Sequence, residues 1–215
     1  METRLKIFTW HVHGSYLYYL SQGNYDIYLP VNDARTEGYI GKGTTYPFGG
    51  HVHEIPLQDI PHTAFDCILF QSARHYQEDQ FRILTPEQQR LPKIYLEHDP
   101  PQQHPTNTHH IVDDPNIILV HVTHFNNLMW DNNRTPSVVI EHGVMVPEQA
   151  RYTGQLERGI VVVNNLVKRG RRLGLDIFNN VSRHVPLDLV GMNAADAGGL
   201  GEVTHTELAA FTSQS

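Results

Sequence analysis

Short apolar segments recur along the chain and alternate with segments whose apolar residues have a helical spacing. Runs rich in β-branched and aromatic residues predict strands, and the amphipathic stretches between them predict helices. The predicted strands are Leu5 to Trp10, Asp26 to Val31, Asp66 to Gln71, Lys93 to Glu97, Ile117 to His121, Ser137 to Ile140, Ile160 to Val163 and Leu187 to Val190. Such alternation predicts parallel strands joined by right-handed crossovers, with ligands bound at the carboxyl ends of the strands.

Helices are expected at residues 16–20, 73–84 and about 171–181, and from about residue 206 onward. Thr85 followed by Pro86 is typical of the cap and first position of another short helix, and Thr123 is expected to cap the helix after it. Residues 32–50 are rich in Gly, Thr and Pro without any period, and they predict a long loop.

The periodic pattern is lost after about residue 145, and a new buried-strand signal, GIVVV, begins at residue 159. We therefore predict an α/β chain in which residues 1–146 form a Rossmann-like N-terminal domain, 147–158 a linker and 159–215 the start of a second Rossmann-like domain. Two strands cannot form a sheet that is covered on both faces, so the second domain is expected to be incomplete.

Composition limits the possible functions. Charged residues make up 18% of the chain and the net charge is -7, so no broad basic face is expected to bind nucleic acid and any anion site must be local. The single cysteine, Cys67, excludes an intramolecular disulfide and a zinc site of several thiolates, as is typical of a reducing compartment. Without a signal-peptide run or the ~20 apolar residues that span a bilayer, a cytoplasmic protein with no transmembrane segment is expected.

Histidine is frequent, with 15 residues, and several of them follow predicted strands. The motif HVHGSY contains His11 and His13, and alternate residues of a strand project to the same face. Two such imidazoles suit a metal-dependent hydrolase, whose further ligands would be later strand-end residues. Hydrogen-bonded structural roles for both histidines are equally open. Gly14 instead favours a tight turn at a helix start, where backbone N–H groups would receive an anion or a carbonyl.

Two further motifs end strands. In LEHDPP the paired prolines fix the backbone after His98 and Asp99, so His98 is presented at a fixed place above the sheet. A histidine that is satisfied by Asp99 or by the backbone is the alternative. In IEHGV, Gly143 after His142 favours a sharp turn, which also occurs without a ligand. HVHEIP and the histidines just before residue 111 are expected to lie in or beside loops and to be solvated.

A basic stretch, KRGRR, follows the first predicted strand of the second domain. Lys168, Arg169, Arg171 and Arg172 are expected near a helix N-terminus, where the macrodipole disfavours cations. A bound phosphate or diphosphate would offset this cost, because cations and backbone N–H groups would then face the same anion. A solvated basic turn is the alternative.

The order of these motifs resembles the retaining nucleotide-sugar glycosyltransferases of the GT-B architecture, which have two facing Rossmann-like domains. In that family the first strand leads into a Gly-containing loop, matched by HVHGSY, and a middle strand ends in a His-Asp pair, matched by YLEHD. The last strand of the family's first domain ends in HGV, matched by IEHGV. VVNNLVKRG takes the place of the strand and the Arg- and Lys-Gly-containing loop that open the family's second domain. The resemblance extends over nearly the whole chain.

The resemblance implies transfer of a sugar from a nucleotide diphosphate donor to a glycan, lipid or small-molecule acceptor, with retention and without a bound metal or other cofactor. His98 would line the donor sugar pocket as the catalytic residue, and Gly14 would approach the donor. Arg169 falls at the family's phosphate-binding Lys, whereas the companion Arg falls near Asn165, which is a departure. The diphosphate would be held by Lys168, Arg169, Arg171 and Arg172, and the cleft between the domains would be lined by His13, Asp99, His142 and Gly143.

Two other function classes fit the sequence. One is a metal-dependent hydrolase that uses His11 and His13, and the other is a binder of nucleotides or glycans without catalytic activity. In the resembled family an acidic motif that grips the donor lies beyond the point that corresponds to residue 215. The chain as given is therefore expected to be a fragment that turns over no sugar alone.

Overall fold

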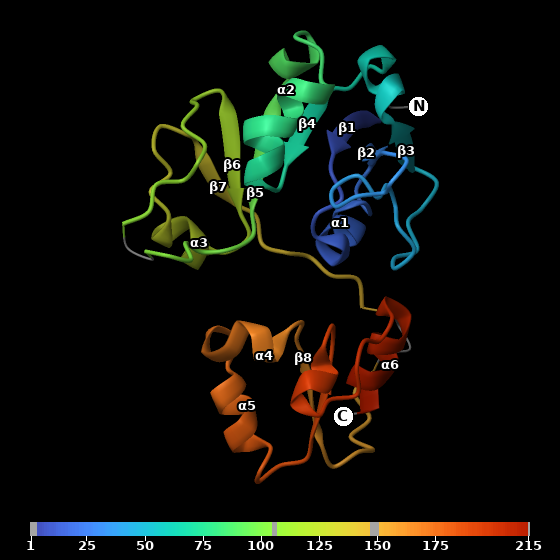
Figure 1. The fold of residues 1–215 in the computed structure, drawn as a ribbon, viewed down its shortest axis with the longest axis vertical. Helices are drawn as coiled ribbons and strands as arrows, with labels where there is room; N and C mark the ends of the chain where they lie inside the picture. The colour runs from blue at the N-terminus through green and yellow to red at the C-terminus, as the bar shows by residue number, and fades with distance from the viewer. Residues whose placement is uncertain (1–3, 105–106, 147–150, 215) are drawn as a thin grey trace. The chain divides into compact units, whose positions relative to one another are not determined.

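The computed structural model describes residues 4–104, 107–146 and 151–214. The chain forms two compact units, Met1–Val144 and Met145–Ser215, which we call unit 1 and unit 2 and describe one at a time (Figure 1). None of the described helices combines the length and the apolar character that a membrane-spanning helix needs.

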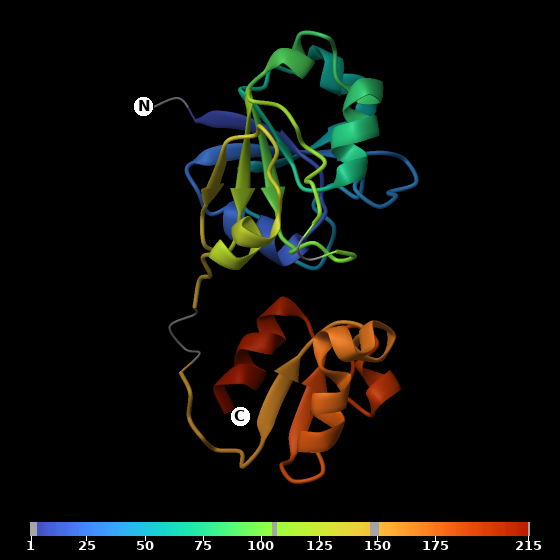
Figure 2. The same ribbon diagram turned by 90° about the vertical axis from the view of Figure 1, so that its left-hand side faces the viewer.

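Unit 1 is built on a sheet of seven strands that all run parallel. They are β1 (Leu5–Thr9), β2 (Tyr25–Val31), β3 (Val52–Pro56), β4 (Cys67–Phe70), β5 (Lys93–Glu97), β6 (Ile117–His121) and β7 (Ser137–Val139). Their order across the sheet is β3-β2-β1-β4-β5-β6-β7, so it reverses between β1 and β4. Figure 2 shows neighbouring strands pointing the same way. This order is that of a doubly wound Rossmann-like sheet, which confirms the predicted α/β class with a parallel sheet.

Helical segments cover both faces of this sheet. They are α1 (Gly14–Leu20), η1 (Leu57–His62), η2 (His75–Asp79), α2 (Gln80–Ile83), η3 (Gln88–Arg90) and α3 (His124–Met129). The η2 segment is π-helical and continues directly into α2. On one face Leu17 of α1 packs against Ile27 and Leu29 of β2. Because successive side chains of a strand point to opposite faces, the residues between them face the other side.

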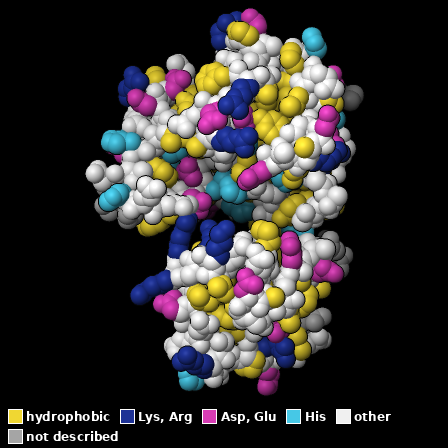
Figure 3. Space-filling model, in the orientation of Figure 1, with side chains coloured by type: hydrophobic (Ala, Val, Ile, Leu, Met, Phe, Trp, Pro, Cys, Tyr) yellow, Lys and Arg dark blue, Asp and Glu magenta, His cyan; other side chains and the backbone are white. Residues whose placement is uncertain are grey.

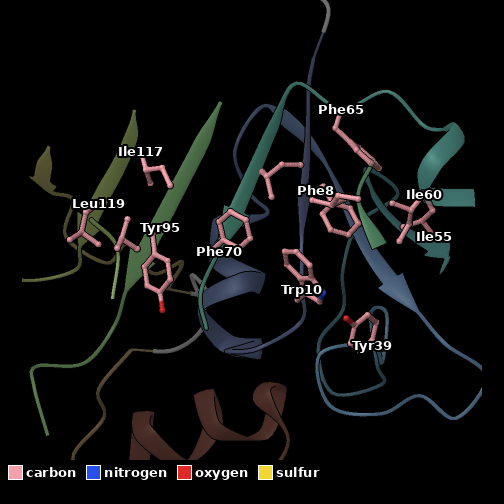
Figure 4. Close-up of a cluster of buried hydrophobic side chains, with 13 residues drawn as sticks. Phe8, Trp10, Tyr39, Ile55, Ile60, Phe65, Phe70, Tyr95, Ile117 and Leu119 are labelled. Carbon is pink, nitrogen blue, oxygen red and sulfur yellow. The ribbon is translucent and has the colours of Figure 1, made fainter. Parts of the chain in front are cut away.

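The larger core lies on that other face (Figure 4). Phe8 of β1, Trp10 just after it and Phe70 of β4 are all fully buried there, and the Phe8 and Trp10 rings pack edge to face with centroids 4.9 Å apart. Burying each such side chain contributes roughly 1.5–3 kcal/mol. Leu69, between Ile68 and Phe70 of β4, belongs instead to a cluster on the α1 face, as the alternation requires.

Two predictions about the loops were wrong. HVHEIP, expected in or beside a loop and solvated, contains the edge strand β3, in which Val52 and Ile55 are buried. Their spacing breaks the alternation that signals a strand, and Pro56 is tolerated because an edge strand needs fewer ladder hydrogen bonds. His110 was also expected to be solvated, but it is buried, with its Nε2 3.2 Å from Glu97 Oε2.

Both predicted helix caps in unit 1 are confirmed. Gln88 at the start of η3 donates its backbone N–H to Thr85 Oγ1 at 3.2 Å, and its side-chain oxygen accepts the Thr85 N–H at 3.0 Å. Thr123 Oγ1 accepts the N–H of Asn126 at 3.0 Å at the start of α3. Each bond satisfies a helix-end N–H that would otherwise lack a partner.

The predicted long loop after β2 is tied down at several points. Glu54 of β3 pairs with both guanidinium nitrogens of Arg35 at 3.1 Å and accepts the backbone N–H of Lys42 at 2.9 Å. His11, just beyond β1, bonds through Nδ1 to the carbonyl of Gly41 at 2.7 Å. This loop is therefore held against the carboxyl ends of the strands.

Unit 2 contains a pair of parallel strands and short helices. Its elements are β8 (Gly159–Val162), α4 (Leu166–Arg169), η4 (Gly170–Leu173), α5 (Leu175–Val181), β9 (Leu187–Val190), η5 (Ala194–Ala197) and α6 (His205–Gln214). Its core is small and centres on Leu166, Leu189 and Ala194. Val162 and Ile177 are 49% and 65% exposed, so much apolar surface stays uncovered within the chain.

The strands of unit 2 lie where the apolar runs predict them, and β8 begins at the predicted start of the second domain. Of the predicted linker, residues 147–150 lie outside the described residues, and 151–158 form neither helix nor strand. That unit 2 opens a second Rossmann-like domain stays a prediction.

The buried imidazole of His75 in η2 generates a prediction about pH. Its ring stacks on Trp10 with centroids 4.8 Å apart, and burial lowers its pKa to about 4 against the opposing effect of Asp79. The unfolded chain, with the ordinary pKa of 6.5, binds a proton between pH 6.5 and 4 that the folded chain does not bind. We expect His75 to lower the free energy of unfolding of unit 1 by up to about 3 kcal/mol as the pH falls through this window.

The measurement is urea unfolding at pH 7 and pH 4.5, followed by tryptophan fluorescence, since Trp10 and Trp130 both belong to unit 1. The variant His75→Phe retains an aromatic ring against Trp10 but cannot be protonated. Its free energy of unfolding should change less with pH than that of the wild type. An equal change in both proteins would contradict the assignment.

Candidate functional site

The carboxyl ends of β1, β4 and β5 are neighbours at the point where the strand order reverses. The chain just after β1 carries His13, the chain just after β5 carries His98, and the chain after β7 carries His142. Ligands of open parallel sheets bind outside this edge, at such a reversal. Figure 3 shows histidine side chains at several places on the surface of unit 1, including a group near the middle of the view.

Ring contacts join the three histidines through Tyr16 of α1. The rings of His13 and His98 have centroids 4.2 Å apart. Tyr16 packs edge to face with His98 at 4.5 Å and stacks on His142 at 4.6 Å. We call these four residues the histidine cluster. The structure thus brings together three histidines from separate motifs, whereas Tyr16 was not singled out because a tyrosine on a helix carries no chemical signal of its own.

Hydrogen bonds from neighbouring elements hold His98 in place. Its Nε2 lies 3.0 Å from Oε1 of Gln71, which follows β4, and Asn126 of α3 donates through Nδ2 to the His98 carbonyl at 2.9 Å. Gln71 is itself buried and donates to Thr9 Oγ1 at 3.4 Å. Because the Gln71 oxygen accepts from it, Nε2 of neutral His98 carries the proton, and Nδ1 is left as a hydrogen-bond acceptor.

The histidines of the cluster favour their neutral forms. Burial, followed by the nearby His13 and His142, lowers the pKa of His98 to about 3. Burial also lowers the pKa values of His13 and His142, although Asp99 and Glu97 oppose the effect at His13. Neutral imidazole has one donor and one acceptor nitrogen, so the cluster can exchange hydrogen bonds with hydroxyl groups but adds no cation.

Asp99 acts mainly through its backbone. Its carbonyl accepts the indole N–H of Trp130 at 2.8 Å, and its N–H donates to Glu97 Oε1 at 2.9 Å. Its carboxylate receives Gln102 Nε2 at 3.4 Å and favours the protonated form of His13. The prolines after Asp99 are therefore assisted by α3 and by the sheet in fixing the His98–Asp99 segment.

His11 lies apart from the histidine cluster and has a structural role. It is buried, bonded to the Gly41 carbonyl, and packed against Phe48 with ring centroids 5.8 Å apart. The expectation that His11 and His13 share one face was wrong, because β1 ends at Thr9 and strand alternation does not extend beyond it. Across the part of the chain that the structure describes, no three His, Cys, Asp or Glu side chains form a group that could hold a metal ion.

The two glycines of the predicted site have different surroundings. A Cβ added to Gly14 would lie 2.5 Å from the ring of Tyr46 and 3.0 Å from His11 Nε2, so only glycine fits at the start of α1. The close approach that Gly14 permits is thus to an aromatic ring of the chain itself. At Gly143 a Cβ would meet nothing within 4 Å. The backbone forms no turn at this residue, so the sharp turn predicted there was wrong.

The basic turn of unit 2 is exposed and spans the junction between two short helical segments, with Arg169 as the N-cap of the second one, η4. Lys168 and Arg169 form the last turn of α4, and Arg171 and Arg172 lie in η4, whereas the next helix, α5, begins at Leu175. Asn165 takes a left-handed conformation and begins α4 earlier than the periodicity indicates. Arg169 thus ends α4 and also begins η4, so the dipoles of these two four-residue segments act on its charge in opposite directions.

Comparison of the chain with protein-family models, curated proteins and solved structures returns no match.

The contact between Gln71 and His98 gives a second prediction. The variant Gln71→Glu places a carboxylate at the same hydrogen-bond distance from His98 Nε2. An adjacent opposite charge raises a histidine pKa by about 1–3 units, so His98 should titrate at a higher pH than in the wild type. NMR titration of labelled histidine, with the His98 resonance assigned from His98→Ala, measures the change.

The control is Gln71→Leu, which has a similar side-chain size but offers no acceptor. This variant should leave the His98 pKa low and allow both neutral tautomers, which 15N shifts distinguish. If Gln71→Glu and Gln71→Leu change the titration of His98 equally, Gln71 does not set its protonation.

Proposed function

We propose that this protein is a glycosyltransferase of the GT-B type, which transfers a sugar from a nucleotide diphosphate donor to an acceptor with retention at the anomeric carbon. The convergence of His13, His98 and His142 supports the proposal most directly. These residues come from the three motifs of unit 1 that carry the resemblance, and they meet at the edge where parallel sheets bind ligands. A chance likeness of three short motifs does not require the motifs to meet.

In the proposed reaction the bond from the anomeric carbon to the diphosphate breaks, and a bond from the same carbon to an acceptor hydroxyl oxygen forms on the same face. The diphosphate leaves with the electron pair and takes up the hydroxyl proton. The charge that develops on the leaving group has to be stabilised by cations and backbone N–H groups. This chemistry needs no nucleophilic side chain.

The residues of unit 1 suit contacts to the sugar. His98 offers the acceptor Nδ1 to a sugar hydroxyl, and Gln71 fixes the tautomer that makes Nδ1 an acceptor. His13, in ring contact with His98, adds a second neutral imidazole. A half-buried, hydrogen-bonded His98 loses little entropy on binding, because its position is already fixed.

The diphosphate is assigned to the basic turn Lys168, Arg169, Arg171 and Arg172. All four side chains are exposed, and Arg171 forms an ion pair with Asp176 at 3.5 Å. An exposed pair of this kind contributes little, so a diphosphate can compete for the guanidinium. The metal-dependent hydrolase is not favoured, because His11 is occupied by Gly41 and Phe48.

Calorimetry with a panel of nucleotide diphosphate sugars and the matching nucleotide diphosphates tests the proposal. We expect one sugar donor to bind more tightly than its nucleotide diphosphate, and His98→Ala to lose about tenfold of that difference, or about 1.4 kcal/mol. Affinity for the nucleotide diphosphate alone should be unchanged. The control His62→Ala removes an exposed histidine at the end of η1. If no donor binds, or if both variants behave alike, the proposal fails.

The basic turn is tested separately. Arg169→Ala should weaken binding of the nucleotide diphosphate by about 1.5–3 kcal/mol, the range for hydrogen bonds to charged groups. Arg183→Ala removes an equal charge from an exposed site in the same unit and should have no such effect. Equal affinities of the wild type and Arg169→Ala would refute the phosphate assignment. Acceptor-dependent release of nucleotide diphosphate by the chain as given would show transfer directly and would contradict the expectation that it turns over no sugar alone.

A further inference from the structure

A second group of polar side chains lies at the reversal of strand order, inside the core of unit 1 rather than at its surface. Trp10 follows β1, His75 and Asp79 belong to η2, which follows β4, and Tyr39 lies in the long loop after β2. Their exposed fractions are 1%, 4%, 2% and 6%, in that order, so each is more than nine-tenths buried. We call these four residues the buried polar cluster.

Ring and charge contacts hold the cluster together. The ring of His75 stacks on Trp10 with centroids 4.8 Å apart, and its Nε2 lies 3.7 Å from Asp79 Oδ2. Tyr39 packs edge to face with His75 at 6.3 Å. Figure 4 shows the indole nitrogen of Trp10 on the side of its ring that faces the Tyr39 hydroxyl.

The Tyr39 hydroxyl lies beside both the indole and the carboxylate. Burial raises the pKa of Tyr39 to about 12, while the nearby Trp10 N–H lowers it and the nearby Asp79 carboxylate raises it. The phenol therefore keeps its proton. Polar groups from three separate segments of the chain thus meet in one buried place.

Several buried atoms of this place lack hydrogen bonds. Among the residues that the structure describes, Trp10 Nε1 and Asp79 Oδ2 have no hydrogen-bond partner, and neither do His75 Nδ1 and Oε1 of the following Gln80. Arg74 balances the charge of Asp79, with its Nε 3.5 Å from Oδ2, but forms no hydrogen bond to that oxygen. Unpaired buried polar atoms are costly, and proteins normally satisfy them with protein groups or ordered water.

The surrounding backbone encloses the cluster closely. Gly38, next to Tyr39, has a φ of 83°, and a Cβ added to it would lie 2.6 Å from His75 Nε2. Glycine therefore lets the loop after β2 close over the imidazole. On the other side the chain forms the π-helical turn η2, a rare conformation that frequently occurs at functional sites.

The chemistry of the unpaired atoms selects the ligand. The charge of Asp79 is balanced by Arg74, and burial favours neutral His75, so no uncompensated charge attracts an ion. The ligand has to accept the Trp10 N–H and also donate to Asp79. An ammonium ion donates but cannot accept, whereas water does both. The close packing of Gly38 and Trp10 on His75 also favours a ligand of a single non-hydrogen atom.

We propose that the buried polar cluster binds a long-lived internal water molecule, which accepts the Trp10 N–H and donates to Asp79 Oδ2. The inference does not depend on the proposed function. The water joins the segments that follow β1 and β4, on the two sides of the reversal in strand order. The first of these segments continues from Trp10 to His13, so the water anchors the chain where it enters the histidine cluster.

The test is NMR detection of water beside the indole Hε1 proton of Trp10, which Trp130→Phe assigns because the chain has two tryptophans. We expect a dipolar cross-peak between water and this proton, with the sign of water that tumbles with the protein. Trp130 is the internal comparison. Its N–H donates to the Asp99 carbonyl at 2.8 Å, so it should show at most the weak contact of surface water.

Tyr39→Phe separates bound water from magnetisation relayed through the exchanging phenol hydroxyl. The cross-peak should persist in this variant, because the indole and the carboxylate remain. Asp79→Leu removes the acceptor and should weaken the peak at least tenfold, while Asp59→Leu, at an exposed site in η1, should leave it unchanged. An undisturbed Trp130 Hε1 resonance shows that unit 1 is folded in each variant.

Ammonium chloride, compared with sodium chloride at equal ionic strength, tests for a cation in the same place. We expect neither salt to move the Trp10 Hε1 resonance differently from the other. The inference is overturned if the wild type shows no cross-peak, if Tyr39→Phe abolishes it, if folded Asp79→Leu retains it in full, or if ammonium alone shifts the resonance. The wild type and Tyr39→Phe decide the matter even where Asp79→Leu does not fold.

Discussion

Every strand of the sheet in unit 1 runs in the same direction, and this constraint places the candidate functional residues at one edge of the sheet. The segment after each strand leaves from the same edge, and the reversal of strand order between β1 and β4 sends the neighbouring connections apart. His13, His98 and His142 follow β1, β5 and β7, which all end at this edge, and Tyr16 of α1 joins them by ring contacts. The long loop after β2 emerges at this edge too, and its Phe48 packs against His11, which follows β1.

The rigidity of this edge comes from buried polar contacts as much as from apolar packing. Gln71 and Asn126 are 6% and 4% exposed, and both direct their side chains at His98. A buried polar group left without its partner costs about 1–3 kcal/mol, so these contacts hold His98 to one position. The Trp130 indole fixes the next residue, Asp99, in the same way. Such supports make a binding site more exact than a loop alone can be.

The sequence predicts the strands well because a parallel sheet buried on both faces needs continuous apolar runs, which Lys93–Glu97 and Ile117–His121 display. The sequence did not predict the edge strand β3, because its buried residues, Val52 and Ile55, do not alternate regularly with polar ones. The three strand-end histidines were found because their motifs end strands. Gln71 and Asn126 were not found, since their roles come from partners 27 and 28 residues away, which no local pattern encodes.

The distribution of charge bears on which part of a donor each unit suits. The strand ends around the histidine cluster carry Glu97, Asp99 and Glu141, and the cluster itself favours neutral imidazoles. In a chain of net charge -7, a diphosphate placed there would meet carboxylates and no nearby histidine cation. A neutral sugar meets no such penalty and can exchange hydrogen bonds with His98 and His13. The exposed cations of KRGRR in unit 2 have the opposite character, because they attract an anion and offer little to a sugar. On the proposed function, the chain therefore separates recognition of the uncharged, reacting sugar from stabilisation of the charged leaving group, and each task falls to residues whose electrostatics suit it.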